Sequence, residues 1–270
     1  MRVKTLRVAH VLRTHYYRFP VDLASVTKGI GSHAMRTAIR PPTDADLIFV
    51  LPRRELARFE ALAVANRQSY VLQEVKGVLL DTFPSTDIKG DGPAVVVDFA
   101  SLKVEVVPAF KEGVNYFVPS TQDGGRWKLE MPNAEIVQLA AADARAKGKV
   151  RDLIRLMKAW RRYREVPIRS VPLRLAAIEF LRSWPLATTG DYRHYGLLVQ
   201  DFLEYLIPFR GGTAMMPGTG ELLNIGDDWS PEASRALKLA QRAVFFSRSA
   251  PAVTPPYWSD IFGPEFAASP

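Results

Sequence analysis

The spacing of hydrophobic residues changes along this chain, from strand-like in the first half to helical in the second. Short apolar runs predict β-strands at residues 26–30, 47–51, 94–99, 103–110, 114–118 and 126–129. Apolar residues three and four positions apart predict helices at residues 1–24, 54–80, 149–164, 173–184, 197–208 and 230–247. We therefore expect an α+β protein of two domains, residues 1–132 and 133–270.

Two stretches lack a periodic pattern and are expected to be irregular. The Gly-rich residues 215–220 contain no lysine of the kind that a phosphate-binding loop requires, so we interpret them as a plain loop. The tail after Pro251 has no periodicity either. We expect its Trp258 and Phe262 to pack onto the rest of the protein.

The composition is that of a folded protein and narrows the choice of partners. Of the 270 residues, 47% are hydrophobic and 24% are charged, which suits a substantial core and argues against disorder. A net charge of +8 favours polyanions, such as nucleotides or nucleic acid. Cysteine is absent, which excludes disulfides and thiolate metal sites. No apolar run is long enough to span a membrane, so we expect a cytoplasmic protein.

Two aspartates enter the most hydrophobic strand of the first half. Asp44 and Asp46 precede the apolar run 47–51, and residues two apart in a strand point to the same face. Two carboxylates at the mouth of a buried strand repel each other unless a cation lies between them. Hard oxygen ligands favour Mg²⁺, which is typically held by a few carboxylates and substrate phosphates.

A Gly-Ser turn lies upstream of these aspartates. Gly31 permits a positive φ and lets backbone N–H groups approach an anion, and Ser32 adds a hydroxyl donor. A phosphate cradle beside paired carboxylates is typical of phosphoryl or nucleotidyl transfer. Arg36 and Arg40 flank the turn, where each could bind phosphate oxygens or remain solvated. His33 is interpreted as a solvent-facing turn residue.

These motifs together resemble a known enzyme superfamily. G-S, a threonine at Thr37 and then Asp-x-Asp entering an apolar strand resemble the polymerase-β-like nucleotidyltransferases. The form G-S-x-x-x-x-T-A-I-R-P over residues 31–41 is similar to the bacterial cyclic-oligonucleotide synthases related to cyclic GMP-AMP synthase and oligoadenylate synthase.

The resemblance implies further site residues. A third metal-binding acid falls on Glu105 in the run VEVVPAF, where the family usually has Asp; Asp98 on the preceding strand is the alternative. Lys158, in LIRLMKAW, matches the lysine that reaches the nucleotide triphosphate, although a lysine at the edge of a buried stripe can also simply snorkel. Ser170 matches a nucleotide-binding serine, but Val171 replaces the base-stacking aromatic that follows it in the family.

The resemblance also implies an architecture and a function. We expect a polymerase-β-like core with a mixed sheet, a C-terminal helical lobe and an active site in the cleft between them. The implied activity is template-independent synthesis of a cyclic di- or oligonucleotide second messenger from NTPs, ATP among them, in antiviral (anti-phage) signalling. It would use two Mg²⁺ ions, with Mn²⁺ as a substitute, in a monomer that a nucleic acid could activate. An RNA tail-adding transferase and an inactive nucleic-acid-binding module with the same fold are the alternatives.

Overall fold

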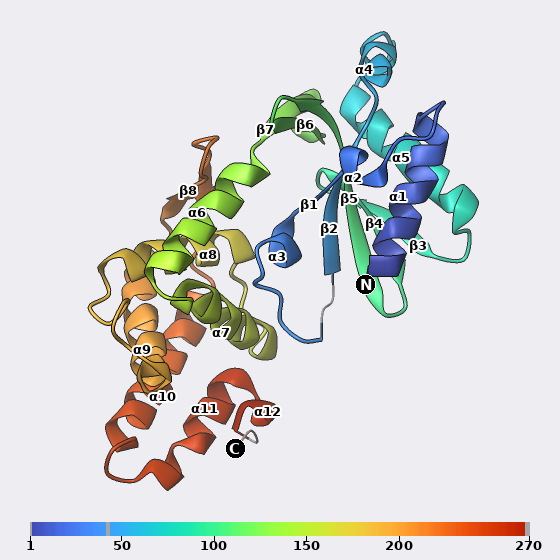
Figure 1. Ribbon diagram of the computed structural model, residues 1–270. Coiled ribbons are helices and arrows are strands. Elements are labelled where there is room, and N and C mark those ends of the chain that lie inside the picture. The colour runs from blue at the N-terminus through green and yellow to red at the C-terminus, as the bar shows by residue number, and fades with distance from the viewer. Residues whose placement is uncertain (1, 42–43, 268–270) are drawn as a thin grey trace. The chain divides into compact units, whose positions relative to one another are not determined.

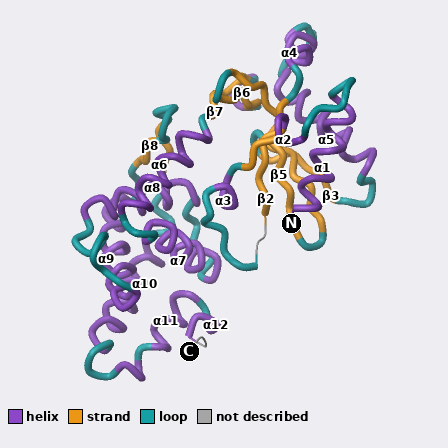
Figure 2. Tube along the Cα trace, in the orientation of Figure 1, coloured by secondary structure: helices purple, strands orange, loops and turns teal. Residues whose placement is uncertain are grey.

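The computed structural model describes residues 2–41 and 44–267 of the chain (Figure 1). This part of the chain divides into two compact units, with the division between Ile136 and Val137. Figure 2 shows that strands concentrate in the first unit and helices in the second. The predicted boundary between the two domains, after residue 132, stays a prediction.

The first unit is built on one mixed sheet of strands with the order β1-β2-β5-β4-β3, to which β6 and β7 are added by pairing of β6 with β5 and β7. The strands are β1 (Thr27–Gly29), β2 (Asp44–Val50), β3 (Asp87–Asp91), β4 (Ala94–Phe99), β5 (Leu102–Glu112), β6 (Asn115–Ser120) and β7 (Arg126–Glu130). β2 runs parallel to β5, whereas the other paired neighbours are antiparallel. The predicted α+β class with a mixed sheet is confirmed.

Helices cover one face of this sheet. The helices of the first unit are α1 (Arg2–Tyr16), α2 (Leu23–Val26), α3 (Gly31–Ala34), α4 (Arg53–Glu60) and α5 (Arg67–Thr82), with a 3₁₀ turn η1 (Gln122–Gly124). α6 (Pro132–Arg145) crosses the division between the units.

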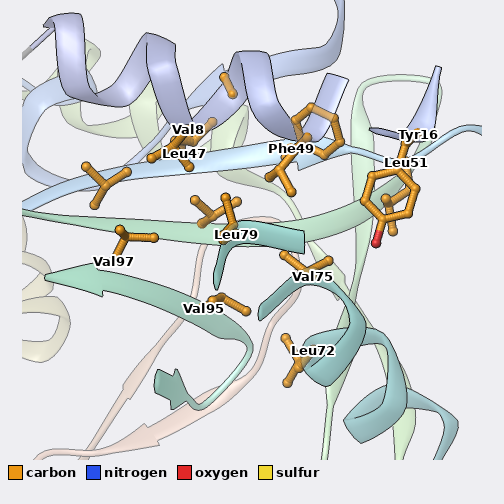
Figure 3. Close-up of a cluster of buried hydrophobic side chains, with 14 of the residues drawn as sticks. Val8, Tyr16, Leu47, Phe49, Leu51, Leu72, Val75, Leu79, Val95 and Val97 are labelled. Carbon is orange, nitrogen blue, oxygen red and sulfur yellow. The ribbon is translucent and has the colours of Figure 1, made fainter. Parts of the chain in front are cut away.

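The alternation of side chains along the strands gives the sheet two different faces. Leu47 and Phe49 of β2 lie on the face that packs against α1 and α5, and both are almost fully buried. Figure 3 shows these strand residues gathered with Val8 of α1 and Leu79 of α5. A core of this kind removes a large apolar area from water and fixes the strands in place. The polar residues at the start of β2 consequently face the other way.

Two predicted helices differ from the structure in the first unit. The helix predicted for residues 1–24 is wrong beyond Tyr16, because the chain leaves α1 before Pro20, and Asp22 then caps the separate short helix α2. The helix predicted for residues 54–80 is two helices, because Asn66 accepts a hydrogen bond from the Ser69 backbone N–H at 2.8 Å and starts α5 there.

One strand of the first unit was missed. β3 has mostly exposed polar residues, and it pairs with β4 through a turn at Gly92. Its sequence, DIKGD, contains a single apolar residue, Ile88, so that a strand pattern is absent.

The second unit is mainly helical. Its helices are α7 (Lys149–Tyr163), α8 (Ser170–Ser183), α9 (Tyr195–Leu206), α10 (Ser230–Phe246), α11 (Pro255–Phe262) and α12 (Pro264–Ala267), with 3₁₀ turns η2 (Tyr192–His194), η3 (Ile207–Phe209) and η4 (Pro251–Val253). Trp160 and Trp229 are fully buried in it. None of the helices formed by residues 2–41 and 44–267 is long and apolar enough to cross a membrane.

Both stretches that were expected to be irregular contain regular elements. A hairpin of β8 (Thr213–Met215) and β9 (Leu222–Asn224) brackets the Gly-rich residues, and the tail forms η4, α11 and α12. The expected packing of the tail is observed, because Phe262 is buried and Trp258 is partly buried beside Gly196 of α9. Both helices in the tail are too short for a periodic signal.

The cap of α5 provides a test of this fold. Asn66 also donates from Nδ2 to the carbonyl oxygen of Thr121 at 3.0 Å, so it links α5 to the segment between β6 and β7. We expect Asn66→Ala to lower the free energy of unfolding by about 1–2 kcal/mol, because the cap and this link are both lost.

Asn66→Asp separates the two contributions, since it keeps the acceptor and favours the helix N-terminus but cannot donate to Thr121. Urea unfolding of the two variants measures the difference. Equal stability of the alanine variant and the wild type would show that the cap contributes nothing.

Candidate active site

Strand register brings three carboxylates together on the face of the sheet opposite α1 and α5. Asp46 of β2 and Glu105 of β5 are directly paired neighbours in the parallel ladder, and Asp44 lies two residues before Asp46 on the same face. Carboxylate oxygens of all three lie within 4.8 Å of one another. Asp44, Asp46 and Glu105, each partly buried, are called the carboxylate site below.

Burial and repulsion by the neighbouring carboxylates both disfavour the ionised form of Glu105. Burial first, and then the charges of Asp46, Asp44 and Asp91, raise the pKa of Glu105 from about 4.5 to about 7. Three anions in this space therefore favour either a proton or a cation. Asp91 lies on β3, the strand without an apolar pattern, so its part in the electrostatics of the site was not predicted.

Gly31 lies against the carboxylate of Asp46. It begins α3 with φ of 63°, in the left-handed region, and a Cβ built at this position would lie 1.8 Å from Oδ2 of Asp46. The neighbouring Ile30 backbone N–H donates to the Asp46 carbonyl oxygen at 3.1 Å. No other residue fits here without displacing the carboxylate, so the glycine sets the close approach of the turn to the site.

Thr37 closes the turn that begins at Gly31. It is 2% exposed, and its backbone N–H donates to the carbonyl oxygen of Ser32 at 2.8 Å. Ser32 is thereby held in the single helical turn α3, next to the glycine.

His33 differs from its expected position. The interpretation as a solvent-facing residue is wrong: the side chain is partly buried, and Nε2 is buried with no hydrogen-bond partner among the residues that the structure describes. A helical turn at α3, in place of an open turn, explains the difference, because it folds the side chain against the protein.

Arg36 and Arg40 follow α3 and precede β2, and both are exposed. Arg36 has a φ of 57°, a conformation that is uncommon for a residue other than glycine. Their position on the segment between the turn and the aspartates agrees with a role in anion binding, which stays a prediction.

Asp98, the alternative third acid, has a partner of its own. It pairs with Lys103 across β4 and β5, and the two side chains form an ion pair of 3.3 Å. Its charge is balanced there, whereas Glu105 faces Asp46. The geometry therefore favours Glu105 as the third acid.

Lys158 and Ser170 belong to the second unit. Lys158 lies in the middle of α7 and is partly buried, and Ser170 is the first residue of α8. Arg161, one turn after Lys158, donates from Nη1 to Oγ of Ser170 at 3.0 Å. Sequence reasoning missed Arg161, since an arginine in a basic helix carries no distinguishing pattern. The structure thus links the helix of Lys158 directly to Ser170.

The carboxylate site fits a divalent cation. Its donors are oxygen atoms alone and they converge on one point, and the neighbouring carboxylates contribute, after burial, to the raised pKa of Glu105. Asp44, Asp46 and Glu105 would hold the ion, and the turn at Gly31 packs directly against Asp46; its role as an anion cradle stays a prediction.

A mixed sheet with three converging carboxylates and a Gly-Ser turn defines a nucleotidyltransferase. Residues 5–142 match the SMODS family, described as the Second Messenger Oligonucleotide or Dinucleotide Synthetase domain, and the chain belongs to this family. No curated protein matches the sequence.

Solved structures with the same fold have low sequence identity. The CdnC:HORMA-deltaN complex of E. coli MS115-1 is 19% identical, with 97% of this chain and 90% of that chain covered and a TM-score of 0.63. The cyclic AMP-GMP synthase DncV of Vibrio cholerae, in complex with a linear pppA(3',5')pG intermediate, is 15% identical, with 92% and 72% covered and a TM-score of 0.67.

The close approach of Gly31 leads to a prediction about metal binding. We expect Gly31→Ala to weaken Mn²⁺ binding about ten- to a hundredfold, because the new methyl group displaces the Asp46 carboxylate. Isothermal titration calorimetry with Mn²⁺ measures the effect. Gly29→Ala is the control, since a Cβ there has nothing within 4 Å, and it should bind as the wild type does. Equal loss in both variants would contradict the role of Gly31.

The raised pKa of Glu105 predicts a pH dependence of stability. Its folded value lies above the unfolded one, so the protonated acid is favoured in the fold. Metal-free protein should therefore lose stability as the pH rises from about 4.5 to about 7. The Tm of EDTA-treated protein across this range measures the effect.

Glu105→Gln should flatten this part of the profile, because the amide does not titrate. The stabilisation by Mg²⁺ should grow with pH over the same range in the wild type, since the ion requires the ionised acid. An unchanged profile in the glutamine variant would assign the pH dependence to another group.

Proposed function

We propose that this chain joins NTPs, without a template, into a short cyclic oligonucleotide that acts as a second messenger. Membership of the synthetase family supports this class of reaction. The observation that carries the proposal is the carboxylate site with Gly31 packed against Asp46. Such a site would place a cation and a triphosphate next to each other, as nucleotidyl transfer requires.

The proposed reaction is a phosphoryl substitution. A ribose hydroxyl of one nucleotide attacks the α-phosphorus of a second, the bond from that phosphorus to the bridging oxygen breaks, and pyrophosphate leaves. The hydroxyl proton passes to solvent. A second transfer of the same kind, within the linear product, closes the ring.

The residues of this chain position the reactants and carry no covalent intermediate. Divalent cations, when bound, would neutralise the triphosphate and lower the pKa of the attacking hydroxyl. Asp44 and Asp46 would hold both ions and Glu105 one of them, while the turn at Gly31 and Ser32 binds the phosphates. Positioning and charge neutralisation then supply the rate.

Glutamate as the third acid affects the choice of metal. We propose two Mg²⁺ ions, with Mn²⁺ as a substitute, because every donor is a carboxylate oxygen.

Substrates and partners follow from the same reasoning. CdnC has been solved with ATP, and we propose ATP among the substrates here. CdnC is also found in complex with a HORMA protein, which supports a protein activator as an alternative to the nucleic acid that the net charge of +8 suggests. We further propose that the protein is a cytoplasmic monomer in anti-phage signalling.

The test is to incubate the full chain with all four NTPs and Mg²⁺ and to identify the products by mass spectrometry. Pyrophosphate and a cyclic oligonucleotide, formed without a primer, are the expected result. Asp46→Asn should reduce turnover by a factor on the order of 10³ or more, because a neutral amide holds the cation poorly.

Asp98→Asn is the matched control, since Asp98 lies on the same sheet face but is ion-paired with Lys103. It should keep most of the activity. Products that are long tails on added RNA, with nothing formed in its absence, would replace the proposal by the tail-adding function.

A prediction concerns Lys158, which we propose binds the triphosphate. Lys158→Met keeps the length and packing of the side chain and removes only the charge. One lost charge-assisted contact corresponds to roughly 1.5–3 kcal/mol, so NTP binding should weaken about ten- to a hundredfold. The shift of Tm on addition of NTP and Mg²⁺ should shrink, with little change of Tm in the ligand-free protein.

Arg155 supplies the control for this variant. It lies one turn earlier on α7 and forms an ion pair with Asp152 at 2.8 Å. Arg155→Met should leave the NTP effect intact. If Lys158→Met binds NTP as well as the wild type does, the lysine is structural.

A further inference from the structure

The second unit contains a cavity of about 950 Å³. Its walls come from α7, η2, α9, α10, α11 and α12, which can be followed in Figure 1. None of the residues of the carboxylate site belongs to it. Cavities of 300 to 1,000 Å³ are typical of sites for small organic ligands, and this one lies near the upper end of that range.

One wall of the cavity is aromatic. Trp258 and Phe262 of α11 are stacked, with ring centroids 6.2 Å apart and an angle of 18° between the rings, and Phe266 lies 4.6 Å from Phe262. The indole N–H of Trp258 has no hydrogen-bond partner among the described residues. Aromatic faces of this kind bind other flat rings, and the indole N–H can donate to a ligand.

Gly196 makes room for this wall. A Cβ at that position would lie 3.2 Å from Cζ2 of Trp258 and 3.3 Å from Cγ2 of Val244. Both distances are shorter than ordinary van der Waals contact, so a side chain at this position of α9 would require Trp258 or Val244 to shift by a few tenths of an ångström. The absence of a side chain therefore fixes how closely α9 approaches α10 and α11.

The cavity is lined by two arginines, Arg193 and Arg248, and by His194. Arg193 and His194 are already paired, since both contact the carboxylate of Asp191, at 2.7 and 3.0 Å. Arg248 at the end of α10 is exposed and has no hydrogen-bond or ion-pair partner among the described residues. Within the described part of the chain, no acidic side chain lines the cavity. An uncompensated guanidinium beside an apolar wall favours an anion.

We propose that this cavity is a second ligand site, which binds a small molecule that combines a flat aromatic ring with an anionic group. The ring lies on the aromatic wall of Trp258, and the anion meets the guanidinium of Arg248. A purely apolar ligand would leave Arg248 unpaired, and an inorganic anion would leave the wall exposed to water.

The dye 8-anilinonaphthalene-1-sulfonate has this chemistry and serves as the probe. Titration of the full chain at low ionic strength, followed by dye fluorescence, should show one saturable site per chain. Arg248→Gln should raise the Kd about three- to tenfold, because one charge-assisted contact at an exposed position is lost. Circular dichroism should show an unchanged fold.

Two controls separate the effect of the Arg248 charge from other effects of the substitution. Arg242→Gln removes another exposed arginine, in α10, that does not line the cavity, and it should leave the Kd unchanged. The uncharged dye N-phenyl-1-naphthylamine should bind the wild type and Arg248→Gln equally. Trp258→Leu should weaken the binding of both dyes, because it removes the ring that they share.

Several results would overturn the proposal. Binding of the anionic dye that does not saturate, or that Arg242→Gln weakens as much as Arg248→Gln does, would show non-specific attraction to a basic surface. Unchanged binding in Arg248→Gln excludes the anion subsite. If Trp258→Leu does not fold, the comparison of Arg248→Gln with Arg242→Gln, and of the anionic dye with the uncharged one, still tests the proposal.

Discussion

Repulsion between three carboxylates on one face of a sheet is the constraint on which the first unit depends. Backbone pairing in the parallel ladder holds Asp46 opposite Glu105, although their charges oppose it. The opposite face supplies the counterforce, because Leu47, Phe49 and Val106 are buried against helices. The hydrophobic contacts on one face of the strands therefore offset the repulsion between the carboxylates on the other face. A bound cation would reduce the repulsion that remains.

The alternation of polar and apolar residues along β2 was sufficient to predict part of this arrangement. The period of two places Asp44 and Asp46 on one face and Leu47 and Phe49 on the other, which is how the structure has them. Glu105 could not be found in this way. A charged residue that interrupts a run of valines indicated a paired or metal-bound acid at Glu105, but its position beside Asp46 depends on pairing between strands far apart in the sequence, and its role came from the resemblance to a family. The left-handed φ of Gly31 agrees with its choice as the turn residue.

The elements that the sequence did not predict also have a physical explanation. β3 is held by backbone pairing with β4 at the edge of the sheet, so its side chains need not be apolar. α11 is stabilised by burial of Ile261 and Phe262, and α12 packs against it through Phe266, which short sequence windows cannot reveal. The predicted functional boundary between the domains and the predicted role of Lys158 both concern nucleotide binding. Neither the hydrophobic pattern nor the packing of the chain tests such a role.

The sheet order also determines when the site can exist during folding. β3, β4 and β5 are consecutive strands paired with their neighbours in the sequence, and contacts of this kind form early. β2 joins them only by closing the long loop that contains α4, α5, β3 and β4, which has a larger entropic cost. We therefore expect Glu105 to be positioned in the sheet before its two partners. A chain that has not closed this loop lacks the carboxylate site, so a cation bound there would stabilise only chains in which the first unit is folded.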